Sequence, residues 1–231
     1  MSGNHGSDIY YVDNIGDTVV ETMVDPTGGA DTVYSYRADY TLGTYVENLR
    51  LLATGAANGN GNSNANTIYA GAGNNVMDGR TGSDTVSYAY ATAGVTASLA
   101  SSLAQATGGS GSDTLLNFEH LTGSNYNDTL TGNSAANTLN GGAGADRLTG
   151  GDGSDNYYVD NIGDVVSETN AVAASGGTDT VFSTATAFTL SANVEDLRLL
   201  ASGAANGTGN SLSNTLYAGA GNNVLDGGAG T

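Results

Sequence analysis

The chain has 231 residues, no cysteine, no lysine and a formal net charge of −18, from 23 acidic residues against five arginines. This composition excludes disulfides, thiolate metal sites and lysine-based catalysis. Because the chain is strongly acidic, we expect it to bind cations, and we expect neither nucleic-acid binding nor membrane insertion. Its 36 glycines recur periodically, so their excess over the roughly 7% of ordinary domains does not indicate disorder.

The first segment begins at Gly3 and reads GNHGSDIYYVDNIGDTVVE. Its alternating apolar residues predict a strand, a turn over Asn14 to Asp17, and a second strand. Its acidic residues are candidate cation ligands: Asp8, Asp13, Asp17 and Glu21. The similar segment GSDNYYVDNIGDVVSE offers Asp160, Asp164 and Glu168 in the same way. For Asp13 and Asp160, a solvated turn with an Asx cap is the alternative.

Two long segments of the chain occur twice. Tyr11 corresponds to Tyr158 and Val46 to Val194, at offsets of 147 and 148 residues. We therefore expect a first long repeat over residues 1–79, a connecting unit over 80–148 and a second copy over 149–231. No linker-like composition separates them, so we expect one continuous solenoid over residues 1–231. Both ends of the chain fall inside a repeat, which predicts a piece of a longer array.

The connecting unit contains an irregular stretch from Gly82 to Ser124. Asp84 and Asp113 follow glycine-rich turns there and are candidate cation ligands. Phe118 and Leu121 are expected to pack into the core.

One nine-residue unit occurs four times in register from Gly123 to Tyr158, as GSNYNDTLT, GNSAANTLN, GGAGADRLT and GGDGSDNYY. The last two copies follow the pattern G-G-x-G-x-D-x-U-x, in which glycines form a tight turn and the sixth position supplies a carboxylate. The eighth position should point inward, and it is occupied by Leu130, Leu139, Leu148 and Tyr157.

These nonamers resemble the RTX, or repeats-in-toxin, modules of secreted bacterial toxins, proteases, lipases, epimerases and adhesins. The resemblance implies an all-β fold, a right-handed parallel β-roll or β-helix solenoid with two nonamers per turn and Ca²⁺ between stacked turns. It would place Asp128, Asp146 and Asp164, which are 18 residues apart, along one edge. Asn137 and Asp155 would lie on the opposite edge.

The resemblance implies that calcium is held by aspartates and by the glycine-rich backbone of the turns. The candidate metal ligands are Asp8, Asp17, Asp84, Asp113, Asp128, Asp146, Asp155, Asp164, Gly142, Gly144, Gly151 and Gly153. Without the ion, stacked carboxylates would repel one another. We therefore expect calcium binding and folding to be coupled.

Several nonamers carry asparagine at the sixth position: Asn66, Asn75, Asn137, Asn214 and Asn223. An amide oxygen can ligate calcium more weakly than a carboxylate, or it can form hydrogen-bonded ladders along a solenoid. Ladders are the expectation for Asn75 and Asn223, whose turns lack a neighbouring acid.

The sequence contains neither GxSxG nor HExxH and only two histidines, so we expect no active site and no enzyme. We expect a calcium-binding segment of a large secreted bacterial protein, at the cell surface or outside the cell. Type I secretion is what the resemblance implies, with folding on calcium binding after export.

Two alternatives remain open. Open stacking edges would allow end-to-end self-association into a filament, a surface layer or an adhesin stalk. A stripe of some of the 13 tyrosines could bind polysaccharide, as expected of an accessory module of a polysaccharide-modifying enzyme.

Overall fold

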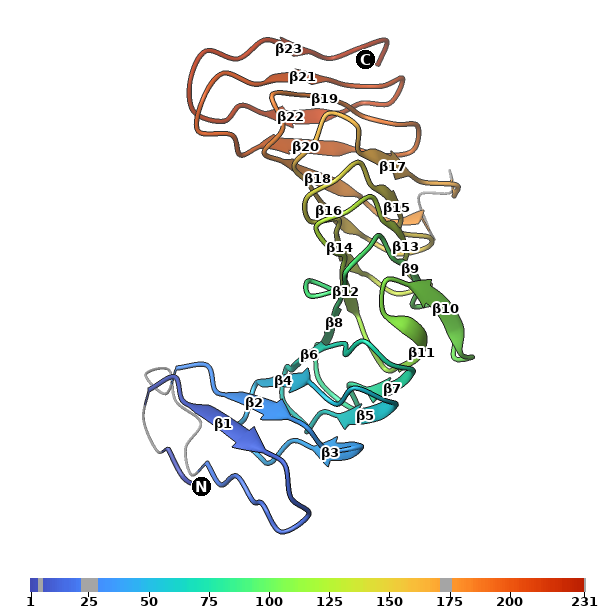
Figure 1. Cartoon of the computed structure of the whole chain (residues 1–231). Coiled ribbons are helices and arrows are strands. Elements are labelled where there is room, and N and C mark those ends of the chain that lie inside the picture. Colours follow the sequence, from blue (N-terminus) through green and yellow to red (C-terminus); the bar gives the residue numbers. More distant parts are fainter. Residues whose placement is uncertain (4–5, 22–28, 171–175, 231) are drawn as a thin grey trace. The chain divides into compact units, whose positions relative to one another are not determined.

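The computed structural model describes residues 1–3, 6–21, 29–170 and 176–230. These residues form short strands that group into two compact units (Figure 1), unit 1 with Met1–Ala93 and Ser101–His120, and unit 2 with Gly94–Ala100 and Leu121–Thr231. The first long repeat thus lies in unit 1 and the second in unit 2. The expectation of one continuous solenoid concerns how these units join, and it stays a prediction.

Unit 1 is built from two rows of parallel strands, and a hairpin adds β10 to β11 in antiparallel pairing. The first row is β1 (Ile9–Val12), β2 (Thr32–Ser35), β4 (Asn48–Leu51), β6 (Thr67–Tyr69) and β8 (Thr85–Ser87). The second row is β3 (Asp39–Thr41), β5 (Ala57–Asn60), β7 (Asn75–Asp78) and β11 (Gly111–Leu116), extended by β10 (Gln105–Gly108).

Unit 2 is built from three rows of parallel strands. The first row is β14 (Thr138–Asn140), β16 (Asn156–Val159), β18 (Thr180–Ser183), β20 (Asp196–Leu199) and β22 (Thr215–Tyr217). The second is β9 (Thr96–Ser98), β13 (Thr129–Thr131), β15 (Arg147–Thr149) and β17 (Val165–Ser167), and the third is β19 (Ala187–Thr189), β21 (Asn206–Thr208) and β23 (Leu225–Asp226). A further strand, β12 (His120–Thr122), spans the boundary between the units.

The interior of each unit contains a column of apolar side chains, contributed by most of its strands. The parallel register in unit 2 aligns Leu139 with Tyr157 and Leu130 with Leu148, and all four are fully buried. Burying a leucine contributes roughly 1.5–3 kcal/mol relative to leaving it exposed. The inward eighth position of the nonamer and the all-β, parallel β-roll fold are therefore confirmed.

The residues of the irregular stretch also follow expectation, because Phe118 and Leu121 are 4% and 0% exposed. The turn predicted in the first segment is present, with Asp17 N donating to Asn14 O at 3.0 Å. Among the described residues, no helix has the length and apolar character of a membrane span.

The nonamer turns depend on glycine backbone geometry. All four glycines predicted to contribute calcium-binding backbone have positive φ: Gly142, Gly144, Gly151 and Gly153. A Cβ at Gly144 would lie 2.6 Å from the carbonyl oxygen of Tyr126 in the turn below. The turns can stack this closely because the position has no side chain.

Replacing Gly144 by alanine should lower the free energy of unfolding by about 1–3 kcal/mol, because φ is +142° and the added methyl would meet backbone. Gly203→Ala is the matched control, since a Cβ there meets no atom within 4 Å. Denaturant unfolding in saturating calcium measures both variants. Equal stability of Gly144→Ala and the control would show that turn stacking does not require this glycine.

Candidate metal centre

The first candidate site is a row of buried aspartates in unit 2, which we call the Asp128 row. It consists of Asp128, Asp146 and Asp164, each directly before a strand of the second row. Asp146 Oδ1 accepts the N–H of Asp128 at 2.8 Å, and Asp164 Oδ1 accepts the N–H of Asp146 at 2.9 Å. The structure therefore brings together the three carboxylates that the 18-residue spacing predicted on one edge.

The opposite edge of unit 2 carries the Asp155 row, which consists of Asn137, Asp155, Asp179 and Glu195. Asp155 Oδ1 accepts the N–H of Asn137 at 2.7 Å, and Asp179 Oδ1 accepts the N–H of Asp155 at 2.8 Å. Glu195 Oε2 then accepts the N–H of Asp179 at 2.9 Å. The pairing of Asn137 with Asp155 was expected, and the structure extends the row by two further carboxylates.

Unit 1 contains the same arrangement before its first strands. Asp31 Oδ1 accepts the N–H of Asp8 at 2.8 Å, and Glu47 Oε2 accepts the N–H of Asp31 at 2.9 Å. Later in the unit, Asp84 Oδ1 accepts the N–H of Asn66 at 2.7 Å. Backbone N–H groups thus hold one oxygen of each acceptor carboxylate in place along the solenoid edge.

The side chains of Asn75 and Asn223 both bond to the backbone of the turn 18 residues earlier. Asn75 Nδ2 donates to the carbonyl oxygen of Ala57 at 3.0 Å, and Asn223 Oδ1 accepts the N–H of Ala205 at 2.8 Å. The backbone N–H of Asn75 also donates to Oδ1 of Asp113, 38 residues later, at 2.8 Å. Ladders of stacked asparagines stay a prediction for both positions.

Asp17 and Asp164 use one carboxylate oxygen within their own turns. Asp17 Oδ2 accepts the N–H groups of Asp13 and Asn14, both at 3.0 Å, and these backbone hydrogen bonds lower the pKa of Asp17. Asp164 Oδ2 likewise accepts the N–H of Asp160 at 3.0 Å. The cap of the first of these turns is therefore Asp17, whereas Asp13 is exposed.

Several carboxylates have one buried oxygen with no hydrogen-bond partner in the described part of the chain. These oxygens are Asp8 Oδ2, Asp84 Oδ2, Asp146 Oδ2, Asp155 Oδ2 and Glu168 Oε2. A Cβ built at Gly79 would contact both the free Asp84 Oδ2 and the carbonyl oxygen of Asn117, so carboxylate and backbone oxygens face the same space there. Free, anionic, hard oxygens beside turn carbonyls are the donor set that calcium prefers.

Burial also raises the pKa of these carboxyl groups. The pKa of Asp146 rises to about 6, because of burial and then the charges of Asp164 and Asp128. Burial raises the pKa of Asp155 to about 6 and, together with neighbouring carboxylates, that of Asp179 to about 7. Each group therefore binds a proton more readily than an exposed carboxylate does.

Asp31, Asp179, Glu47 and Glu195 were not predicted as site residues. They lie outside the nonamers, in segments that read GGADTV, GGTDTV, VENL and VEDL. The signal that could have found them is the long repeat itself, because each acid recurs at an equivalent position before an apolar strand.

Comparison with known protein families agrees with this geometry. A model of the RTX calcium-binding nonapeptide repeat matches in four copies, within residues 55–87, 122–157 and 208–231. No curated protein matches the chain at a significant level. The matched residues include the Asp128 row up to Asp146 and the Asp155 row up to Asp155.

Proposed function

Because the chain is an RTX-type calcium-binding repeat protein, we propose that calcium bound between its stacked turns drives the folding of the solenoid outside the cell. The observation that carries this proposal is the set of buried carboxylate oxygens without a hydrogen-bond partner among the described residues. Unneutralised charge in such positions destabilises a fold strongly, and a bound cation removes that penalty.

The residues proposed to hold calcium are those whose free oxygens face the space between turns. Asp146 and Asp155 have the clearest geometry, because each is fully buried, is fixed by one N–H group and has one free oxygen. Asp8 and Asp84 each also have an Oδ2 without a hydrogen-bond partner among the described residues. Asp113 differs, because Thr107 Oγ1 donates to its second oxygen at 3.0 Å.

Folding driven by external calcium suits a protein that is exported as an unfolded chain. RTX repeats are typical of secreted proteins, and their family is generally structural rather than catalytic. In calcium-poor cytosol the acidic chain would repel itself and remain open to export. The experiment that tests this proposal is removal and return of calcium, with the folded fraction as the readout.

A second candidate function, glycan binding, is favoured by an aromatic stripe on each unit. In unit 2 the rings of Tyr158 and Phe182 stack at 4.9 Å, and Arg198 lies 5.9 Å over Phe182 and 4.2 Å over Tyr217. The parallel register aligns these four residues, and Tyr158 and Tyr217 are about half exposed. Flat rings beside a guanidinium suit the sugar faces and carboxylates of an acidic polysaccharide.

Unit 1 has an equivalent stripe: the Tyr11 and Tyr34 rings stack at 5.1 Å, and Arg50 lies 5.6 Å over Tyr34. If the stripes bind glycan, Tyr158→Ala should reduce retention on alginate beads, whereas Tyr126→Ala, which removes another exposed tyrosine, should not. Equal retention of both variants and the wild type would leave the stripes with a packing role only.

A further inference from the structure

Three carboxylates from separate segments converge in unit 2, and we call them the unit 2 acidic cluster. They belong to Asp155, Glu168 and Asp179, and one oxygen from each lies within 4.8 Å of the others. Asp155 precedes β16, Glu168 follows β17 and Asp179 precedes β18. Only Asp155 occupies the sixth position of a nonamer.

Unit 1 contains the same constellation, the unit 1 acidic cluster. It consists of Asp8, Glu21 and Asp31, with the same limit of 4.8 Å between their ligand oxygens. These residues are the long-repeat counterparts of the unit 2 acidic cluster. Tyr10, the counterpart of Tyr157, donates its hydroxyl to Glu21. The arrangement thus occurs once per long repeat.

The unit 2 acidic cluster has buried polar atoms without partners among the described residues. Asp155 is 0% exposed with a free Oδ2, and Glu168 is 6% exposed with a free Oε2. Tyr157 is 0% exposed, and its hydroxyl also has no partner. A Cβ at Gly150 would contact Asp155 Oδ2, the Tyr157 hydroxyl and Glu168 Oε1, so these oxygens surround one space.

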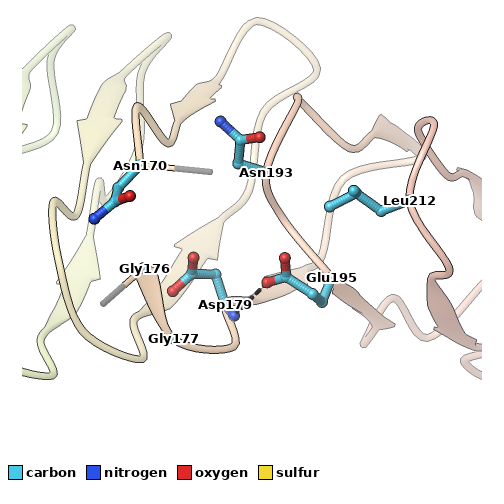
Figure 2. Close-up of a pocket in the computed structure, with 7 residues that line it drawn as sticks. All are labelled: Asn170, Gly176, Gly177, Asp179, Asn193, Glu195 and Leu212. Carbon is cyan, nitrogen blue, oxygen red and sulfur yellow. Dashed lines mark hydrogen bonds between the residues drawn. The ribbon is translucent and has the colours of Figure 1, made fainter. Parts of the chain in front are cut away.

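A cavity of about 150 Å³ adjoins the unit 2 acidic cluster and is lined in part by Asp179 and Glu195 (Figure 2). Figure 2 shows these two side chains next to each other, joined by the hydrogen bond from Asp179 N to Glu195. The cavity has room for water, which calcium commonly retains among its roughly six to eight oxygen ligands.

We propose that each acidic cluster binds one calcium ion through side-chain oxygens, so that Asp155 and Asp8 hold the ion of their cluster, a second kind of site beside the glycine-aspartate turns of Asp146 and Asp84. Three carboxylates supply more negative charge than a repeat turn, which favours tighter binding of a hard divalent cation. The ion would join Asp155, the segment after β17 and the turn before β18, which lie in separate parts of the chain. This inference rests on the proposed calcium binding but concerns residues that the nonamer pattern does not assign.

The first test is the calcium-binding curve of the full chain, measured by equilibrium dialysis from free concentrations below the tightest site up to saturation. Glu168→Gln and Glu21→Gln should each shift the binding of one ion to free calcium concentrations about ten-fold higher or more. The double variant should shift two ions. Asp39→Asn, which removes an exposed charge from β3, should leave the curve unchanged.

The outcomes separate the two proposals. A wild type that binds no calcium would overturn both. A wild type that binds calcium and a double variant with the same binding curve would overturn the acidic clusters alone.

A second variant covers the case in which the glutamine substitutions fail to fold. Tyr157→Phe removes only a hydroxyl without a partner in the described residues, so the fold should persist. With terbium in place of calcium, energy transfer from Tyr157 should give emission that falls in Tyr157→Phe and stays constant in Tyr36→Phe, which changes an exposed tyrosine. Unchanged emission from Tyr157→Phe would place no ion at the unit 2 acidic cluster.

Discussion

Treatment with a chelator should convert the folded protein into a largely unfolded chain, and returning calcium should restore the β signal cooperatively. The reason is the 23 acids against five arginines, with many of the acids stacked in buried rows. Neighbouring turns share each row, so binding at one turn orders the next. Far-UV circular dichroism during a calcium titration of chelator-treated protein measures the transition.

Magnesium and acid provide the controls for this experiment. Magnesium should not restore the signal at equal concentration, because it demands a smaller, octahedral shell and gives up water reluctantly. Acid should restore part of it, because burial and neighbouring acids raise the pKa of Glu168 to about 8 and that of Asp179 to about 7. A folded pKa above the unfolded value means that protons stabilise the fold, so calcium-free stability falls as pH rises from about 4 through these values.

A full β signal in chelator at neutral pH would contradict the calcium-driven account. Apolar stacking and asparagine ladders would then suffice for the fold. The self-associating filament would become the leading alternative, and sedimentation of the calcium-free protein would test it.

Asp146→Asn should change stability in opposite directions with and without calcium. Asp146 is 0% exposed between two other aspartates, and its Oδ2 has no partner in the described part of the chain. In chelator, the neutral amide removes a buried charge and should raise the folded fraction. In calcium, it removes an anionic oxygen that we propose as a calcium ligand, so the calcium concentration at half folding should rise about ten-fold or more.

Asn137→Asp is the reverse substitution in the other row of unit 2. Asn137 Oδ1 already accepts the N–H of Asn133 at 2.7 Å, so the carboxylate can take the same position. It should lower the calcium concentration at half folding and destabilise the calcium-free fold. If both variants had the wild-type calcium midpoint, the rows would not contain the ions that drive folding.

The inward positions of the solenoid were predictable because they depend on local periodicity. Leu130, Leu139 and Leu148 recur every nine residues, and each is fully buried. The row of Asp128, Asp146 and Asp164 was predictable for the same reason, once the length of a turn was supplied by the family resemblance. Finding the repeat in the sequence is enough to identify such positions.

Partners brought together by insertions between turns were not predictable from the nonamer. Asp155 stacks on Asp179, which is 24 residues away rather than 18, because a longer connection precedes β18. Asn75 stacks on Asp113 across 38 residues, since the strands between them belong to other rows or to the hairpin. The nonamer rule fails wherever a turn of the solenoid contains an insertion.

By itself the sequence determined the all-β solenoid, the glycine turns, the apolar column and the calcium-binding class, because each depends on residues at fixed short spacing. The tertiary structure alone decided which acids converge, which oxygens already hold an N–H group and which are free. Those properties depend on which residues become neighbours when turns of unequal length stack. The number of residues in a connection does not determine the path that the connection takes. The grouping of Asp155, Glu168 and Asp179 is the clearest instance, since each residue comes from a different segment.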